Sequence, residues 1–214
     1  MRDSRTIKLL GIKNTEVLVS TEEIKRGLVD ENALPQNFPT HAQEPYFWEC
    51  LGRTVATFGF LEEVLAKAIF AITATTKYAE DEIEEVYAKW ISTLEKSLSD
   101  PLGGLIHTYD KAVHSNSETT IGNLDDLLYD LRAISKMRNV LCHGSWRSPD
   151  ENGASVPFFV TRQKEVFETP VDISFLNQVY KHAVKLICAV MNSVTHMGWQ
   201  FPATTGAGKV IGGE

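Results

Sequence analysis

A long amphipathic segment between Glu44 and Thr75 is the feature that most constrains the fold of this chain. Its apolar residues recur three and four positions apart, which is the spacing of one face of an α-helix and not of a strand. Pro45 suits a helix start, because the first turn needs no amide donor. Such a stripe has to be covered by other helices. The stripe consists of Phe47, Leu51, Phe58, Leu61, Leu65, Ile69 and Ile72.

Four further segments have helical spacing. They are Ile121 to Gly144, residues 79–98 with an acidic start, the shorter stretch from Pro101 to Ser115, and Asp172 to Met197. We therefore expect a mainly all-α protein, an antiparallel bundle of four or five helices. In the last segment the residues predicted to face inward are Leu176, Val179, Tyr180, Ala183, Ile187, Val190 and Val194.

The remaining segments define the predicted domain boundaries. Residues 1–42 are expected to be an N-terminal arm with two short strands, residues 43–198 the helical bundle, and residues 199–214 a flexible, Gly-rich C-terminal tail. A small β-hairpin is expected at 155–168. Its strands would be Val156 to Val160 and Lys164 to Glu168, after a turn-forming stretch at 148–153.

Composition restricts the partners. The net charge of −7 argues against broad nonspecific binding to nucleic acid. Residues 131–149, however, contain no Asp or Glu, and this local cationic patch suits a small phosphate-binding site or is a chance cluster on a solvated face. No apolar stretch of membrane-spanning length and no signal region occur, so we expect a cytoplasmic protein without a membrane partner. The patch consists of Arg132, Lys136, Arg138 and Arg147.

Neither a metal nor another cofactor is expected. Cys50, Cys142 and Cys188 form no CxxC pair, and their neighbours suggest burial in helices, which argues against a disulfide framework and a zinc site. The carboxylates of residues 80–85 lack nearby His or Cys. They are interpreted as a solvated helix face, and a metal-dependent hydrolase built on them is a weaker alternative.

Arg138 is the residue whose position demands a partner. About 100° per residue along the helix places it within the apolar arc of 121–144. An unpaired buried guanidinium is unfavourable by several kcal/mol, so it must face a carboxylate, backbone oxygens or a phosphate. Glu62, on the flank of the first stripe, is the best-placed carboxylate. That pair is either structural or holds the guanidinium in a catalytic pose.

His143 lies five residues further on and ends the segment with Gly144 behind it. Five helical residues leave the two side chains roughly 140° apart. They are therefore expected to meet only if the helix ends between them or if two copies of the chain pair. Histidine titrates near neutral pH and arginine is a permanent cation, a combination suited to phosphodiester cleavage.

The string from Met137 to Gly144 resembles the signature of the HEPN superfamily, an arginine and a histidine separated by four to six residues, with a polar residue after the arginine. Asn139 fills that polar position. The resemblance implies a helical bundle and a metal-independent endoribonuclease of a toxin–antitoxin, defence or RNA-processing system. It also implies a symmetric homodimer, RNA as substrate and an antitoxin protein as a further partner.

In this hypothesis Arg138, His143 and Asn139 are catalytic and Glu62 supports Arg138. Lys136, Trp146 and Arg147 are candidates for substrate binding, with Trp146 stacking on a base or serving only in packing. The alternative is a non-catalytic dimeric binding or regulatory module of the same fold. In that case Arg138 is a structural ion pair and His143 caps the helix.

Overall fold

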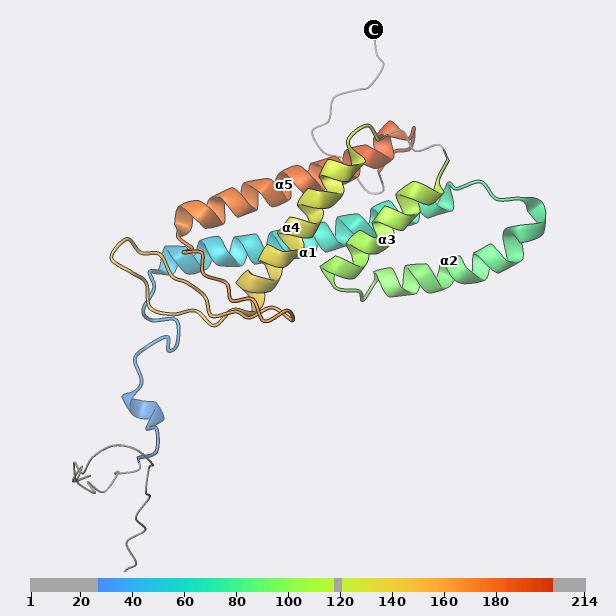
Figure 1. Cartoon of the computed structure of the whole chain (residues 1–214). Helices are drawn as coiled ribbons and strands as arrows, with labels where there is room; N and C mark the ends of the chain where they lie inside the picture. The colour runs from blue at the N-terminus through green and yellow to red at the C-terminus, as the bar shows by residue number, and fades with distance from the viewer. Residues whose placement is uncertain (1–26, 118–120, 202–214) are drawn as a thin grey trace, which may run out of the picture. The chain divides into compact units, whose positions relative to one another are not determined.

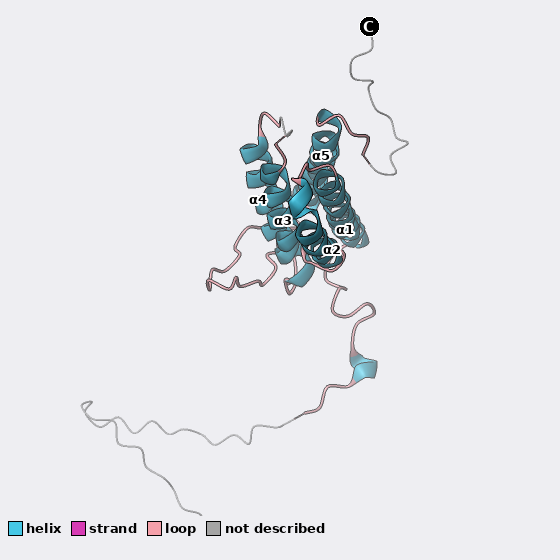
Figure 2. Cartoon of the chain, turned by 90° about the vertical axis from the view of Figure 1, so that its right-hand side faces the viewer, coloured by secondary structure: helices cyan, strands magenta, loops and turns pink. Residues whose placement is uncertain are grey.

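The computed structural model describes residues 27–117 and 121–201, and the regular structure there is helical (Figures 1 and 2). The chain divides into two units between Gln36 and Asn37. The described part of the first unit contains a 3₁₀ turn, Glu31–Ala33, capped by the Asp30 carboxylate. The strands predicted in the arm lie outside the described residues. The described part of the second unit contains five α-helices: α1 (Pro45–Ala74), α2 (Ile83–Ser97), α3 (Leu102–Ser115), α4 (Leu124–His143) and α5 (Ile173–His196).

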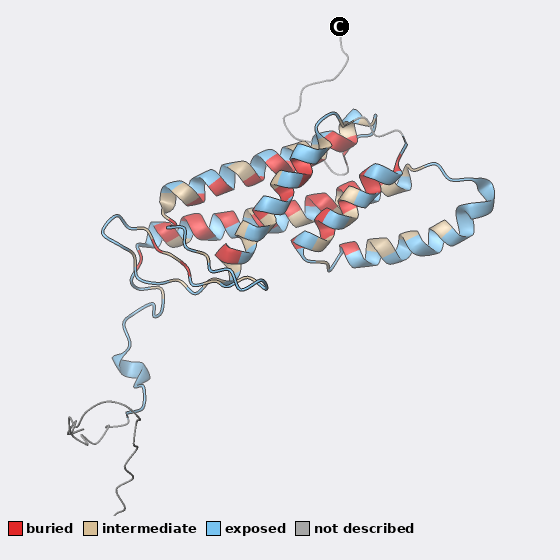
Figure 3. Cartoon of the chain, viewed as in Figure 1, coloured by how far each residue is buried: buried red, intermediate tan, exposed pale blue. Residues whose placement is uncertain are grey.

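α1 is the central helix, and its predicted apolar stripe is confirmed. Every residue of the stripe is buried, from Phe47 at the first turn to Ile72 at the last. α5 packs on α1 more extensively than α3 or α4 does. In Figure 3 the buried positions follow the facing sides of these helices. Full burial of each large apolar side chain contributes about 1.5–3 kcal/mol, so these interfaces hold the unit together.

The directions of the helices differ in part from the prediction. Consecutive helices alternate in direction, as expected (Figure 1). The helices that pack most extensively on α1 nevertheless run parallel to it. Thr54 Oγ1 lies 3.5 Å from the Leu176 carbonyl oxygen, near the starts of α1 and α5. Asn116 Nδ2, just past α3, donates to the Ile72 carbonyl near the end of α1 at 3.1 Å. The antiparallel prediction therefore holds for helices that are neighbours in sequence and not for those that pack most extensively on α1.

α2 is attached to the other helices along a narrow contact. Its predicted acidic start forms a 3₁₀ turn, Glu80–Glu82, and the carboxylate-bearing residues there are exposed, as a solvated face requires. Ser97 is its one buried residue. Trp90 anchors the helix, because its indole Nε1 donates to Thr73 Oγ1 of α1 at 2.9 Å.

More residues of α5 are exposed to solvent than the helical spacing predicted. Tyr180, expected inward, is 39% exposed, and Cys188, expected to be buried, is exposed as well. These residues lie eight apart and share a face that no described helix covers. Phe201, which the prediction assigned to the C-terminal tail, is only 3% exposed and belongs to the core, and residues 202–214 of the predicted tail lie outside the described residues. Within residues 27–117 and 121–201, no helix combines the length and apolarity needed to cross a membrane.

Residues 144–172 connect α4 to α5 without forming a strand, so the predicted β-hairpin at 155–168 is wrong. Isolated antiparallel bridges join Ser145 to Phe158, Ser155 to Val171 and Val160 to Val166. Pro157 has no amide donor and interrupts the first predicted strand. Two of the three bridges pair this segment with the ends of the loop, near α4 and α5. The third bridge, Val160 to Val166, joins the two predicted strands at a single residue pair, so they meet without forming a ladder.

Candidate functional site

The end of α4 is fixed by a close approach of the following loop. α4 ends at His143, and the Gly144 amide donates to the Val140 carbonyl at 2.8 Å. Gly144 does not adopt the left-handed conformation usual for a glycine after a helix, since its φ is −68°. A Cβ on Gly144 would instead lie 2.6 Å from the Val140 oxygen and 2.8 Å from the Pro157 Cβ. Glycine therefore lets the loop cross the helix end beside His143.

Arg138 faces α1, and its guanidinium lies against Glu62. Nη2 is 3.3 Å from Glu62 Oε1, and the side chains are 23% and 27% exposed. This carboxylate is the one that the helical spacing favoured. Oε1 is enclosed but accepts no hydrogen bond in the described structure, because the guanidinium N–H bonds do not point along the contact. The attraction is therefore mainly coulombic, and the carboxylate depends on the nearby positive charge.

The other end of the same guanidinium reaches His143 and Asn139. Arg138 Nη1 is 3.3 Å from His143 Nε2 and 3.4 Å from Asn139 Oδ1. This contact forms within one chain while α4 continues through His143. The expectation that the helix must end between the two residues, or that two copies must pair, is therefore wrong. The angle of 140° separates their Cα–Cβ directions, whereas a long arginine side chain can extend along the helix by about one turn.

A hydrogen bond between Arg138 Nη1 and His143 Nε2 requires one protonation state of the imidazole. Arginine keeps its proton, so Nη1 donates and His143 Nε2 has to accept. In this arrangement the imidazole is neutral and carries its proton on Nδ1. A basic ring nitrogen thus lies beside a fixed cation that has further N–H donors. His143 is exposed and Arg138 is half-buried, so the base lies nearer to solvent than the cation.

Cys142, between Asn139 and His143 on α4, does not provide a nucleophile. Burial raises the pKa of its thiol, and the charge on Glu62 raises it further, while the charge on Arg138 opposes both. The thiol therefore stays protonated near neutral pH.

The residues predicted to bind substrate lie in three different environments. Lys136 is exposed on α4. Trp146 is half-buried, with its ring edge-to-face against Phe47 at a centroid distance of 5.2 Å. The Arg147 guanidinium lies over the Phe158 ring, 5.2 Å from its centroid. Lys136 and Arg147 are both exposed, and Trp146 packs against Phe47 while part of its ring remains accessible.

A second charged cluster on α3 and α4 escaped the sequence reasoning. Arg132 Nη2 lies 2.7 Å from Asp110 Oδ2, and His114 Nδ1 lies 2.9 Å from Asp110 Oδ1. The hydrogen bond between His114 and the Asp110 carbonyl raises the pKa of this histidine, and the Asp110 charge adds to the effect. The cationic patch was predicted from residues 131–149, and the Asp110 carboxylate that contacts Arg132 lies outside that segment. A carboxylate on another helix lies against each of the two arginines, Asp110 against Arg132 and Glu62 against Arg138.

Within the part of the chain that the structure describes, no three His, Cys, Asp or Glu side chains group as metal ligands would. Comparison of the chain with family models, curated proteins and solved structures gives no match. The function therefore has to be inferred from the geometry of the site.

Proposed function

We propose that this protein is an endoribonuclease of the HEPN type that cleaves RNA without a metal ion. The observation that carries the proposal is the convergence of His143 Nε2 and Asn139 Oδ1 on one guanidinium nitrogen of Arg138, at 3.3 and 3.4 Å. A base and a permanent cation at one helix end are the groups that such a reaction needs.

In the proposed reaction His143 Nε2 accepts the proton of a ribose 2′-hydroxyl, and that oxygen attacks the adjacent phosphorus. The bond from phosphorus to the 5′-oxygen breaks, and this oxygen takes a proton from solvent water to leave as a hydroxyl, while His143 releases the proton it accepted. The products are a 2′,3′-cyclic phosphate and a 5′-hydroxyl end. Arg138 stabilises the extra negative charge on the pentacoordinate phosphorus, an effect worth about 10²–10³ in rate for a comparable single donor.

Substrate binding has to change one contact. In the free protein His143 Nε2 lies 3.3 Å from Arg138 Nη1, and a lone pair that accepts from this guanidinium is not available to a hydroxyl. A phosphate competes for the same guanidinium, because a bidentate contact between two opposite charges is stronger than a hydrogen bond from the guanidinium to a neutral imidazole. Arg138 then binds the phosphate through Nη1 while Nη2 keeps its contact with Glu62 on α1, and His143 Nε2 becomes free to act as the base.

The proposed biological setting follows from the resemblance of the motif. It is cleavage of RNA in a toxin–antitoxin, defence or RNA-processing role in the cytoplasm, by a homodimer that pairs two motifs. An antitoxin protein would silence the toxin form. Exposure of His143 supports access of an RNA strand to the site. Asn139 would hold the guanidinium between the imidazole and the phosphate.

The test is digestion of single-stranded RNA in EDTA by the full chain and by Arg138→Ala and His143→Ala. We expect cleavage by the wild type, cyclic phosphate ends on the products, and loss of activity in both variants. Circular dichroism establishes that the variants are folded. Cleavage that depends on added divalent ions, or that survives both substitutions, would refute the proposal.

A second function, a non-catalytic dimeric binding or regulatory module, is favoured by one observation. Glu62 Oε1 is enclosed without a hydrogen bond, so its carboxylate relies on Arg138 for stability whatever else the arginine does. If folded wild-type protein never cleaves RNA and Arg138→Ala mainly lowers the free energy of unfolding, this structural function replaces the catalytic one.

A further inference from the structure

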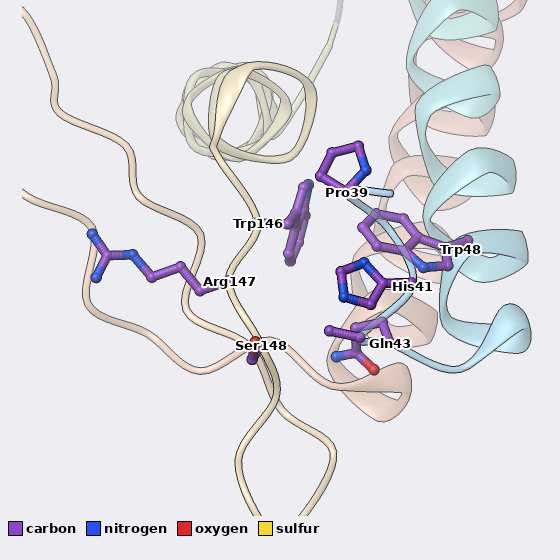
Figure 4. Close-up of a pocket in the computed structure, with 8 residues that line it drawn as sticks. Pro39, His41, Gln43, Trp48, Trp146, Arg147 and Ser148 are labelled. Atoms are coloured by element: carbon purple, nitrogen blue, oxygen red, sulfur yellow. The ribbon is translucent and has the colours of Figure 1, made fainter. Parts of the chain in front are cut away.

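A cavity of about 320 Å³ lies beside the start of α1. One of its walls, residues 146–148, follows His143 closely in the sequence. Its walls come from the residues before α1, the first turn of α1 and the loop after α4. They include His41, Gln43, Trp48, Trp146 and Ser148 (Figure 4). The volume is near the lower end of the range of about 300–1,000 Å³ that is usual for small-ligand sites.

Two indole rings form the sides of this cavity, and packing fixes both. Trp48 Nε1 donates to the Thr40 carbonyl at 2.9 Å, and Trp146 packs edge-to-face against Phe47. Figure 4 shows the Trp146 ring edge-on, with one face turned toward His41 and Trp48. Both indoles are only half-buried, so aromatic surface remains free inside the cavity. A rigid aromatic surface is well suited to stacking with another planar group.

The polar groups of the cavity favour an uncharged ligand. Gln43 uses its side chain within the protein, donating to the Gly153 carbonyl and accepting from the Glu44 amide. The exposed His41 ring stacks on Phe38 and makes no hydrogen bond among the described residues, so its ring nitrogens can meet a ligand. The Arg147 guanidinium points away from the cavity in Figure 4. Arg147 lines the cavity, but its guanidinium lies over the Phe158 ring, so a planar group with hydrogen-bonding edges fits better than a phosphate.

We infer that this cavity binds a nucleobase of the RNA strand whose phosphate lies at Arg138 and His143. The inference rests on the proposed function and adds a base-binding subsite to it. Trp146 follows His143 by three residues, which span at most about 10 Å, so the bound base lies within a few nucleotides of the cleaved bond. The base stacks on the indole surface and His41 bonds its edge. Because every base has a π-face, the subsite tolerates different sequences.

The test compares two uncleavable strands that differ only in their bases. A fluorescently labelled 2′-O-methyl oligonucleotide lacks the attacking hydroxyl, and a strand of the same length with abasic sugars keeps the phosphates. Affinity for the full chain is measured by fluorescence anisotropy. We expect the strand with bases to bind at least about tenfold more tightly, as the loss of a stacked base implies.

The variants assign that difference to the cavity. His41→Ala, Trp48→Leu and Trp146→Leu are each expected to weaken binding of the base-bearing strand about tenfold and to leave the abasic strand unchanged. Trp90→Leu is the matched control, because Trp90 is also half-buried and hydrogen-bonded but lies on α2. If Trp146→Leu fails to fold, the exposed His41 carries the test.

The outcomes separate this inference from the proposed function. Equal affinity for the two strands, or equal effects of Trp90→Leu and the cavity variants, overturns the base-binding subsite even if cleavage depends on Arg138 and His143. Base-dependent binding that the cavity variants abolish supports the subsite even if no cleavage is ever found. If neither strand binds but N-acetyltryptophanamide does, the cavity holds a protein side chain and the inference is wrong.

Discussion

α4 takes part in two clusters, each made of an arginine, a carboxylate and a histidine, but their order differs. In the cluster of Arg132, Asp110 and His114 the carboxylate lies between the two basic groups, with contacts of 2.7 and 2.9 Å. In the cluster of Arg138, Glu62 and His143 the arginine lies in the middle, with contacts of 3.3 Å on both sides.

The order determines what each cluster can do. A central carboxylate satisfies both of its neighbours and stabilises the protonated histidine, so the first cluster is complete without a ligand. A central arginine requires a neutral histidine and makes only long contacts, so its donors remain open to a stronger acceptor. The Arg132 side chain is 56% exposed and that of Arg138 is 23% exposed, which makes the second charge the less hydrated one. The second cluster is therefore the better suited of the two to the phosphate contact that the proposed function requires.

The largest expected difference between the clusters is in RNA cleavage. Arg138→Lys keeps the charge but loses the planar fork that contacts Glu62 and His143 together, so we expect the rate to fall about a hundredfold or more. Arg132→Lys, six residues earlier on α4, should leave the rate unchanged. Initial rates in EDTA measure both. Similar losses in the two variants would mean that α4 contributes only its general positive charge.

Replacing the same two arginines should also change the free energy of unfolding differently, but this difference is smaller than the one in cleavage rate. Arg138→Ala leaves the enclosed Glu62 carboxylate without a cation, and we expect the free energy of unfolding to fall by roughly 2–3 kcal/mol, less than the loss of a fully buried partner causes. Arg132→Ala removes an exposed contact and should lower it by less than about 1 kcal/mol. Urea unfolding followed by circular dichroism measures these changes.

A double variant tests whether the lost stability of Arg138→Ala comes from the unpaired Glu62 charge. In Arg138→Ala with Glu62→Gln the uncompensated charge is gone, so part of the lost stability should return. If the double variant is no more stable than Arg138→Ala alone, the arginine stabilises the helix contact through packing and not through charge.

Replacing two glycines near these clusters by alanine should affect stability differently. Gly144→Ala places a Cβ against backbone 2.6 Å away, and we expect unfolding free energy to fall by about 1–2 kcal/mol. Gly103→Ala in α3, beside the cavity that Arg132 borders, meets only Ser135 Oγ at 3.6 Å and should be neutral or stabilising. Thermal melts compare the two. A stable Gly144→Ala would show that the loop does not fix the position of His143.

Helical spacing predicted more of the fold than of the site. It predicted the positions of α1, α4 and α5 and the orientation of Arg138 toward Glu62, because local periodicity determines which residues share a helix face. It could not reveal the contact of Arg132 with Asp110 or the cavity formed by His41 and Trp146. Those depend on which helices and loops pack together, and local periodicity does not specify that. The hairpin failed for a related reason, since two of the three bridges pair the middle of the loop with Ser145 and Val171 at its ends.

The smallest expected effect is the pH dependence of the cluster around Asp110. The pKa of His114 is raised in the folded chain by its hydrogen bond to the Asp110 carbonyl, with the Asp110 and Asp125 charges acting in the same direction. The folded state therefore binds this proton more tightly than the unfolded state. Its contribution to stability is complete below the unfolded pKa of about 6.5 and disappears as pH rises through the folded pKa. His114→Gln should lower the urea midpoint at about pH 5 and leave it unchanged at about pH 9. An equal change at both pH values would show that the ring contributes through its uncharged contacts, and the Asp110 cluster would then lack the stabilised imidazolium that separates it from the cluster around Arg138.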